Sequence, residues 1–168
     1  MDIALLIVRL VVGLAIAAHG TQKLFGWFGG YGVAGTAGFF EGLGFRPGRL
    51  FVYGASLGEI GGGVLTALGL GGPIGPALVV MVMVVAIFSV HISKGFWAQN
   101  GGYELNTLYI AIALLLGFVG FGTYSLDRAL SLSLLAETWQ IWTTFAVAVL
   151  LAFANLAARK APAPSAAG

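Results

Sequence analysis

Long apolar segments dominate the sequence and limit what the chain can fold into. Five of them approach the roughly 20 residues that an α-helix needs to cross the hydrocarbon of a bilayer. They cover Ile3–Leu24, Leu50–Leu70, Pro73–Ile92, Glu104–Phe121 and Thr138–Ala157. Only 8% of the residues are charged, against roughly 25% in ordinary soluble domains. The sequence therefore predicts an all-α, polytopic membrane helix bundle surrounded by lipid.

The segments between the spans are short except for one. Residues 25–49 are too rich in glycine and polar residues to cross a membrane, yet too aromatic for a simple solvated loop. We expect an interfacial loop there, in which residues 36–44 could form a short amphipathic helix. The proline-rich residues 159–168 are expected to form a disordered tail.

The distribution of lysine and arginine predicts the orientation. With five spans, six of these residues fall on one face of the membrane: Lys23, Arg46, Arg49, Lys94, Arg159 and Lys160. The opposite face receives only Arg128. Because positively charged loops stay in the cytoplasm, we expect a multi-pass membrane protein with its N-terminus outside and its C-terminus in the cytoplasm.

Composition also excludes several classes of function. A net charge of +2 without a basic run gives no reason to expect nucleic acid as a partner. The absence of cysteine excludes disulfides, covalently attached c-type haem and cysteine-ligated iron–sulfur clusters within this chain. Any redox chemistry would therefore need a partner subunit or a bound cofactor.

Polar side chains from three separate segments are expected at one depth. The first and third spans end on the predicted cytoplasmic side, and the fourth begins there, so their terminal residues lie within about 8 Å of the same membrane face. The candidate catalytic residues at this level are His19, Lys23, His91 and Glu104. Shared depth alone is suggestive, because polar residues belong at helix ends.

Glu59 is the strongest single signal. It lies about 13 Å inside the second span, where a charged carboxylate costs at least about 2.5–3.5 kcal/mol. Such a group should be paired, protonated or in contact with a wet cavity. We favour a structural ion pair with Arg9, the other ionisable residue well inside a span. The alternative is a catalytic carboxylate that transfers protons or binds a quinone.

Glycines flank Glu59 at a regular spacing. Gly54, Gly58 and Gly62 recur every fourth residue and form a smooth strip on one helix face. Strips of this kind let two transmembrane helices approach closely. Packing within the bundle is the favoured interpretation, and dimerisation the alternative.

Aromatic residues gather in the two loops on the predicted cytoplasmic side. Trp and Tyr commonly collect at membrane interfaces, so an aromatic belt is the favoured interpretation. The alternative is a pocket wall for a flat apolar ligand such as a quinone ring. The residues that would then bind the cofactor are Trp27, Phe28, Phe96, Trp97 and Tyr103.

The two histidines raise the question of a haem or a metal. His19 and His91 lie on different helices at a similar depth and could in principle ligate a b-type haem, but equal depth is necessary and far from sufficient. The cofactor is therefore left unknown: a quinone is possible, and a b-type haem is not expected. No residues show the close spacing that a metal site requires, so no metal is expected.

Several ordered motifs resemble the DoxX family of small bacterial and archaeal membrane proteins over about residues 3–130. They are the stretch at residues 19–30 (HGTQKLFGWFGG), Phe39-Phe40, Gly58-Glu59, Gly62-Gly63, His91, Lys94-Gly95-Phe96, Gly101-Gly102-Tyr103-Glu104 and Tyr124-Ser125-Leu126-Asp127. The resemblance implies a four-helix bundle for residues 1–130, to which residues 131–158 would add a fifth, C-terminal transmembrane helix.

The resemblance also implies a location in the plasma membrane of a bacterium or archaeon, and a range of functions. The family is named for a subunit of an archaeal thiosulfate:quinone oxidoreductase, and other members are linked to membrane oxidoreductase assemblies or to defence against oxidative stress. We therefore expect a membrane subunit of a quinone-linked or respiratory oxidoreductase, enzymatic at most together with a partner protein. A non-catalytic accessory subunit of a larger membrane complex is the main alternative, and a small transporter ranks behind both.

Overall fold

The computed structural model describes residues 1–160, and every regular element within them is helical. The chain folds into α1 (Asp2–Phe25), α2 (Gly32–Gly42), α3 (Gly48–Leu68), α4 (Ile74–Ala86), α5 (Glu104–Val119), α6 (Leu126–Ala129) and α7 (Thr138–Ala157). A π-helical turn, Ile87–His91, and a 3-10 turn, Ile92–Lys94, continue α4 without a break. Two further 3-10 turns cover Trp27–Gly29 and Ala98–Asn100.

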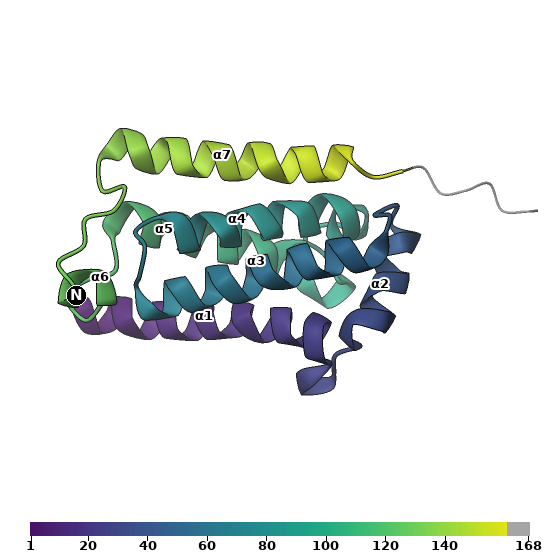
Figure 1. Ribbon diagram of the computed structural model, residues 1–168, viewed down its shortest axis with the longest axis horizontal. Helices are drawn as coiled ribbons and strands as arrows, with labels where there is room; N and C mark the ends of the chain where they lie inside the picture. Colours follow the sequence, from purple (N-terminus) through teal and green to yellow (C-terminus); the bar gives the residue numbers. More distant parts are fainter. Residues whose placement is uncertain (161–168) are drawn as a thin grey trace, which may run out of the picture.

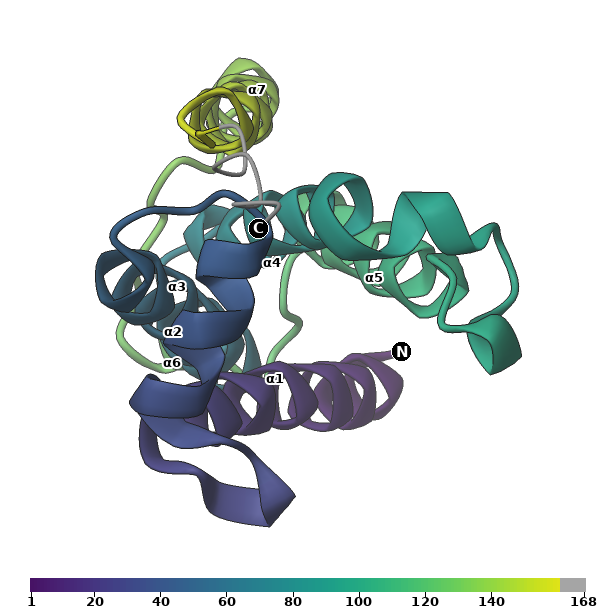
Figure 2. The same cartoon turned by 90° about the vertical axis from the view of Figure 1, so that its right-hand side faces the viewer.

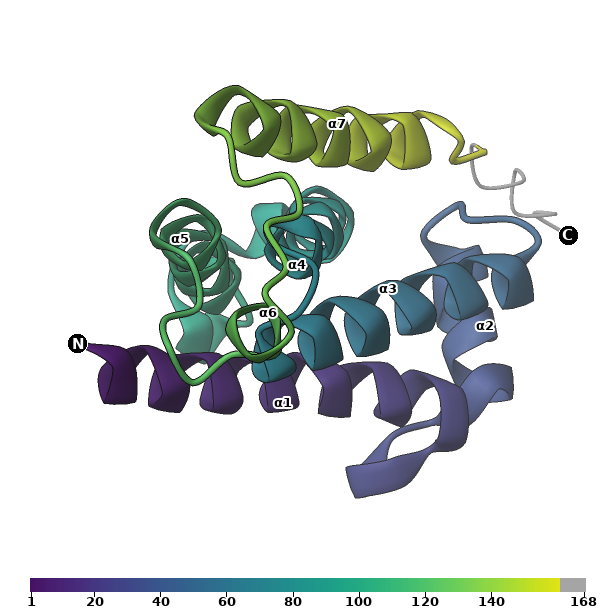
Figure 3. The same ribbon diagram turned by 60° about the vertical axis from the view of Figure 1, so that its left-hand side comes forward.

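The long helices run back and forth between two ends of the molecule, which are marked by α2 and α6 (Figure 1). The α2 helix crosses one end of the bundle beside the first residues of α3. Figure 3 shows that α4 and α5 are inclined to α1, α3 and α7, because the first pair is seen nearly end-on while the other three run across the view. The central element is α4, which packs against α3, α5 and α7.

Glycines bring α1 and α3 into direct backbone contact. A Cβ atom on Gly13 would lie 2.5 Å from the Gly63 carbonyl oxygen, and one on Gly20 would lie 2.8 Å from the Ser56 carbonyl oxygen. Because Gly13 lies beside Gly63 while Gly20 lies beside Ser56, the two helices are antiparallel. Small residues give transmembrane helices this close approach in the absence of a hydrophobic drive between them.

The predicted glycine strip on α3 is only partly used for helix packing. A Cβ atom on Gly62 would come 2.9 Å from the Leu78 Cβ on α4, and one on Gly58 would come 3.2 Å from a Val82 methyl group. Nothing lies within 4 Å of a Cβ on Gly54. Two of the three glycines therefore pack against α4 within the chain, whereas Gly54 faces open space.

Within residues 1–160, four helices are long and apolar enough to cross a membrane: α1, α3, α7 and the continuous segment Ile74–Lys94. The predicted ends of these spans agree with the structure to within about two residues. The expected fourth span is shorter than predicted, because α5 has 16 residues and ends at Val119 before Gly120, whose φ of 85° belongs to the left-handed region. At 1.5 Å per residue α5 is about 24 Å long.

The α7 helix contacts the other helices through only one of its own faces (Figure 2). Phe153 contacts Phe88 with ring centroids 5.4 Å apart, and Phe145 stacks on Phe118 at 5.7 Å. Its other face carries exposed apolar side chains, including Trp139 and Leu150, as expected of a helix that faces lipid.

The chain beyond α7 turns back toward α2 and α3. The Lys160 amide donates a hydrogen bond to the Gly44 carbonyl at 2.8 Å, and the Arg159 guanidinium lies 5.8 Å from the centre of the Phe45 ring. The first two residues of the expected disordered tail are therefore held in place. The rest of it, residues 161–168, lies outside the described residues.

Candidate functional site

A cavity of about 570 Å³ lies at the end of the bundle that carries α2. Segments from α1, α2, α3, the end of α4, α5 and α7 contribute to its wall. Most of the lining is apolar, and the polar or charged side chains on it are His19, Lys23, Glu59, Ser89, His91, Asn106, Tyr109 and Asn155. A largely apolar cavity with a few converging polar groups is the usual form of a small-molecule site.

An ion pair between Lys23 and Glu59 forms the charged part of this wall. The Lys23 Nζ donates to both Glu59 carboxylate oxygens, at 2.7 and 2.6 Å, and lies 3.4 Å from the His19 carbonyl oxygen. The Glu59 side chain is 8% exposed and that of Lys23 is 26% exposed. Removing one partner of a buried pair leaves an uncompensated charge, which makes the pair an energetic constraint on the fold.

Arg9 is not the partner of Glu59, which corrects the predicted ion pair. The antiparallel register places Arg9 beside Gly69, ten residues further along α3 than Glu59, or about 15 Å away. Arg9 donates instead to the carbonyl oxygens of Leu68, at 3.4 Å, and Tyr124. The prediction compared the depths of Arg9 and Glu59 by counting residues from the ends of their helices. It was wrong because the N-terminal part of α1 extends beyond the end of α3, so the two helix ends do not lie at the same level.

His19 lies on α1 one turn before Lys23. Its Nδ1 is 3.0 Å from Gln22 Oε1, while the Gln22 Nε2 donates to the Phe28 carbonyl oxygen at 3.2 Å. The second bond fixes which end of the amide faces the histidine. His19 Nδ1 therefore meets an oxygen, which can only accept a hydrogen bond.

His91 closes the π-helical turn at the end of α4. Its Nδ1 is 2.6 Å from the Gly101 carbonyl oxygen, which ties the third span to the loop before α5. The turn, Ile87–His91, brings Ser89 and Val90 to the cavity wall together with His91. Single π-helical turns within α-helices are frequent at functional sites.

Glu104 differs from the other candidate catalytic residues, because it does not line the cavity. Its Oε2 accepts a hydrogen bond from the Ala98 amide at 2.9 Å. Backbone bonds from Tyr103 to Gly95 and from Glu104 to Phe96 close the same loop. Glu104 therefore holds the loop that carries Gly101, the acceptor for His91.

The five aromatic residues predicted to bind a cofactor do not line the cavity either. Phe96 packs edge-on against Trp97 and Tyr103, with centroids 5.2 and 5.4 Å away, and Trp27 packs against Phe28 at 6.4 Å. Trp27, Phe28 and Trp97 are exposed, as expected of an interfacial belt.

Other aromatic residues form the apolar wall: Phe39, Phe40, Phe45, Phe51 and Tyr109. Three of the phenylalanine rings make a chain, with centroids 5.9 Å apart between Phe40 and Phe45 and 5.1 Å between Phe45 and Phe51. The sequence prediction of a cofactor-binding wall included none of these five residues. The signal that was available is their clustering on both sides of the Arg46-Pro47 turn, where α2 folds back onto α3.

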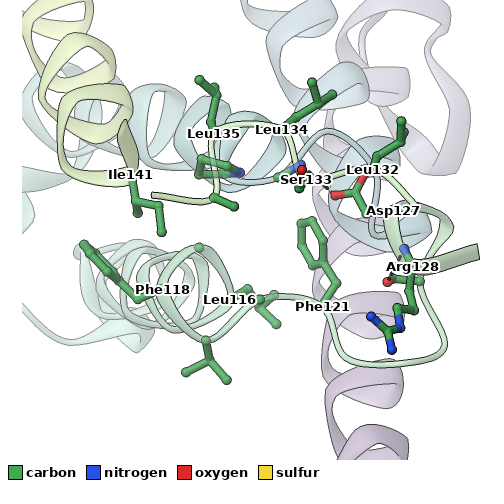
Figure 4. A pocket seen from close by; sticks show the side chains of 17 residues that line it. Leu116, Phe118, Phe121, Asp127, Arg128, Leu132, Ser133, Leu134, Leu135 and Ile141 are labelled. Atoms are coloured by element: carbon green, nitrogen blue, oxygen red, sulfur yellow. Dashed lines mark hydrogen bonds between the residues drawn. The ribbon is translucent and has the colours of Figure 1, made fainter. Parts of the chain in front are cut away.

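A second, smaller hollow of about 320 Å³ lies at the opposite end, between α5, α6 and the start of α7 (Figure 4). Asp127 lies on its wall, but both carboxylate oxygens already accept hydrogen bonds, from the amides of Gly71 at 2.9 Å and Gly72 at 2.8 Å. Its role is to join α6 to the α3–α4 turn. The larger cavity is therefore the better candidate for a functional site.

No group of three His, Asp or Glu side chains within residues 1–160 is arranged to hold a metal ion. The polar groups of the cavity instead combine one ammonium–carboxylate pair with two imidazoles. Such a set can form hydrogen bonds with a ligand and can exchange protons with it.

The fold defines a polytopic helical membrane protein, and its bundle contains a largely apolar cavity lined by a few polar side chains. The sequence model of the DoxX family matches residues 4–92, and the chain belongs to that family. The matched residues include His19, Lys23, Glu59 and His91, and they end before α5 rather than near residue 130. Among curated proteins and among solved structures, nothing matches the chain at a significant level.

Proposed function

We propose that this protein is a membrane subunit that binds a quinone-type ligand and works with an oxidoreductase partner. The observation that carries the proposal is the cavity of about 570 Å³, in which the Lys23–Glu59 ion pair and two histidines face an aromatic and aliphatic wall. A quinone has the matching chemistry, since its flat ring and apolar tail carry carbonyl or hydroxyl groups at the ring edge.

Each group of side chains on the cavity wall has a role in this proposal. Phe39, Phe40 and Phe45 offer ring faces and edges for stacking against a flat ligand. His19 and His91 supply hydrogen-bonding nitrogens, and Glu59 with Lys23 supplies a carboxylate that could exchange a proton with the ligand. Electrons would pass to or from a partner subunit at the membrane surface.

The distribution of positively charged residues indicates on which side of the membrane the proposed site lies. Lys23, Arg46, Arg49, Lys94 and Arg159 lie at helix ends or loops on the α2 side of the bundle, where the cavity lies. By the positive-inside rule this side faces the cytoplasm. The proposed site would then lie near the cytoplasmic face, with the N-terminus outside the cell.

The test is the quinone content of protein purified in mild detergent, measured by extraction and mass spectrometry. Gly54 lines the cavity and has nothing within 4 Å of an added Cβ, so Gly54→Phe should fill the cavity without displacing a helix. Gly61 is the matched control, because it lies on the same helix with the same free space but does not line the cavity.

We expect a substantial fraction of the parent protein and of Gly61→Phe to carry a quinone, and Gly54→Phe to carry little. Parent protein that contains no quinone even after incubation with a soluble analogue would overturn the proposal. A stable larger complex with an empty cavity would favour the accessory subunit instead.

A further inference from the structure

We infer from the hydrogen bonds around the two histidines that the cavity prefers the reduced ligand, a quinol, over the oxidised quinone. This inference rests on the proposed function, since it names the redox form that the same site selects. The preference follows from which polar atoms of the wall are still free to bind a ligand, and from whether those atoms donate or accept hydrogen bonds.

Both histidines are fixed in the same tautomer. The Nδ1 of His91 faces the Gly101 carbonyl oxygen at 2.6 Å, and the Nδ1 of His19 faces the Gln22 Oε1 at 3.0 Å. Neither oxygen can donate, so each Nδ1 must carry the proton. In a neutral imidazole the other nitrogen, Nε2, is then a hydrogen-bond acceptor.

The donors on the same side of the cavity are already in use. The ammonium of Lys23 has three N–H groups, and three oxygens lie within reach: both carboxylate oxygens of Glu59 and the His19 carbonyl oxygen. The Ser89 hydroxyl donates to the Val85 carbonyl at 2.6 Å. What this part of the wall offers a ligand is therefore acceptors: imidazole Nε2 atoms, a hydroxyl oxygen and a carboxylate.

A quinol fits this set and a quinone does not. The quinol donates from a hydroxyl group at either end of its ring, whereas the quinone has two carbonyl oxygens that only accept. A quinone bound against these acceptors would leave them unpaired within the cavity, at a cost that favours the reduced form.

Three further lining side chains carry hydrogen-bond donors, and they lie on other elements. Asn106 uses its amide nitrogen in a 3.4 Å contact with the Met83 sulfur. Tyr109 on α5 and Asn155 on α7 have side-chain donors without a partner within the described residues. They could bind a quinone carbonyl, which makes Tyr109→Phe the informative counterpart to a histidine substitution.

The experiment compares the affinities of a decyl-substituted benzoquinone and its quinol for the full-length protein in nanodiscs, by anaerobic calorimetry against empty nanodiscs. We expect the quinol to bind about tenfold more tightly, since it gains at least one net hydrogen bond. For the two-electron couple this difference raises the midpoint potential of the bound ligand by about 30 mV. His91→Phe should reduce quinol affinity about fivefold and should not weaken the binding of the quinone, because it removes an acceptor that the quinone leaves unpaired. Tyr109→Phe should weaken only the quinone.

The outcomes separate this inference from the proposed function. If both forms bind equally, or if the quinone binds more tightly, the redox preference is refuted while the ligand site stands. If neither form binds, both proposals fail. Should His91→Phe misfold, ¹⁵N NMR of the histidine-labelled parent protein decides the tautomer directly, and a proton on Nε2 of either histidine would refute the inference.

Discussion

Breaking the Lys23–Glu59 ion pair should destabilise the protein more than removing the whole pair. The two groups meet through contacts of 2.6 and 2.7 Å, and the Glu59 side chain is 8% exposed. Losing one member of a buried pair costs about 3–5 kcal/mol, because the other charge stays buried without compensation. Lys23 is about one quarter exposed, so Lys23→Met should cost about 3 kcal/mol, at the lower end of this range.

The companion variants complete a double-mutant cycle. Glu59→Met leaves an ammonium group that can reach toward the membrane surface, so we expect a smaller loss of about 1–2 kcal/mol. Replacing both residues with Met restores an apolar wall and should return stability to within about 1 kcal/mol of the parent. The free energy of unfolding can be measured in mixed micelles of dodecylmaltoside and SDS, followed by circular dichroism.

Lys94→Met serves as the control, because this lysine at the same end of the bundle forms no ion pair within the described residues. It should change the free energy of unfolding by less than about 0.5 kcal/mol. Strict additivity of the Lys23 and Glu59 substitutions would refute the reasoning, since it would mean that the two side chains do not interact.

The remaining predictions concern the packing, the buried arginine and the topology. Gly63→Ala should cost about 1–3 kcal/mol, since its Cβ would lie 2.6 Å from the Ala17 nitrogen, whereas Gly61→Ala, with free space, should be neutral or slightly stabilising in the same unfolding assay. Arg9→Gln removes hydrogen bonds from a charged donor to two backbone carbonyls and should cost about 1.5–3 kcal/mol; an unchanged unfolding curve would contradict this. A reporter fused after Lys160 should be active only on the cytoplasmic side, and activity outside would reverse the orientation.

The sequence predicted the helices well because lipid imposes a simple rule on them. Every spanning segment must satisfy its own backbone and present apolar side chains, so the predicted span Thr138–Ala157 coincides with α7. The rule says less about length when a glycine ends a helix early. That is why α5 ends at Val119 rather than at Phe121.

The candidate site could be predicted only in part. His19, Lys23, Glu59 and His91 stand out as polar residues in apolar segments, and the structure brings all four to one cavity. Their partners depend on the register between α1 and α3, which the close contacts of Gly13 and Gly20 set. No pattern within a single segment encodes that register, so the pairing of Glu59 with Lys23 could not be read in advance.

The aromatic wall escaped prediction for a related reason. The sequence does not distinguish Trp27 and Phe96 from Phe45 and Phe51, because aromatic residues occur both at membrane interfaces and in binding cavities. Only the fold of α2 onto α3 separates them, by turning Phe45 and Phe51 inward.

Photoaffinity labelling tests the central claim most directly. An azido-quinone would be activated on the protein in native membranes, and the labelled peptides identified by mass spectrometry. The proposed site predicts labels on residues 39–55 and 81–91, which form most of the cavity wall, and their loss in Gly54→Phe but not in Gly61→Phe. Labels confined to the lipid-facing side of α7, unchanged in both variants, would contradict a quinone site in the cavity.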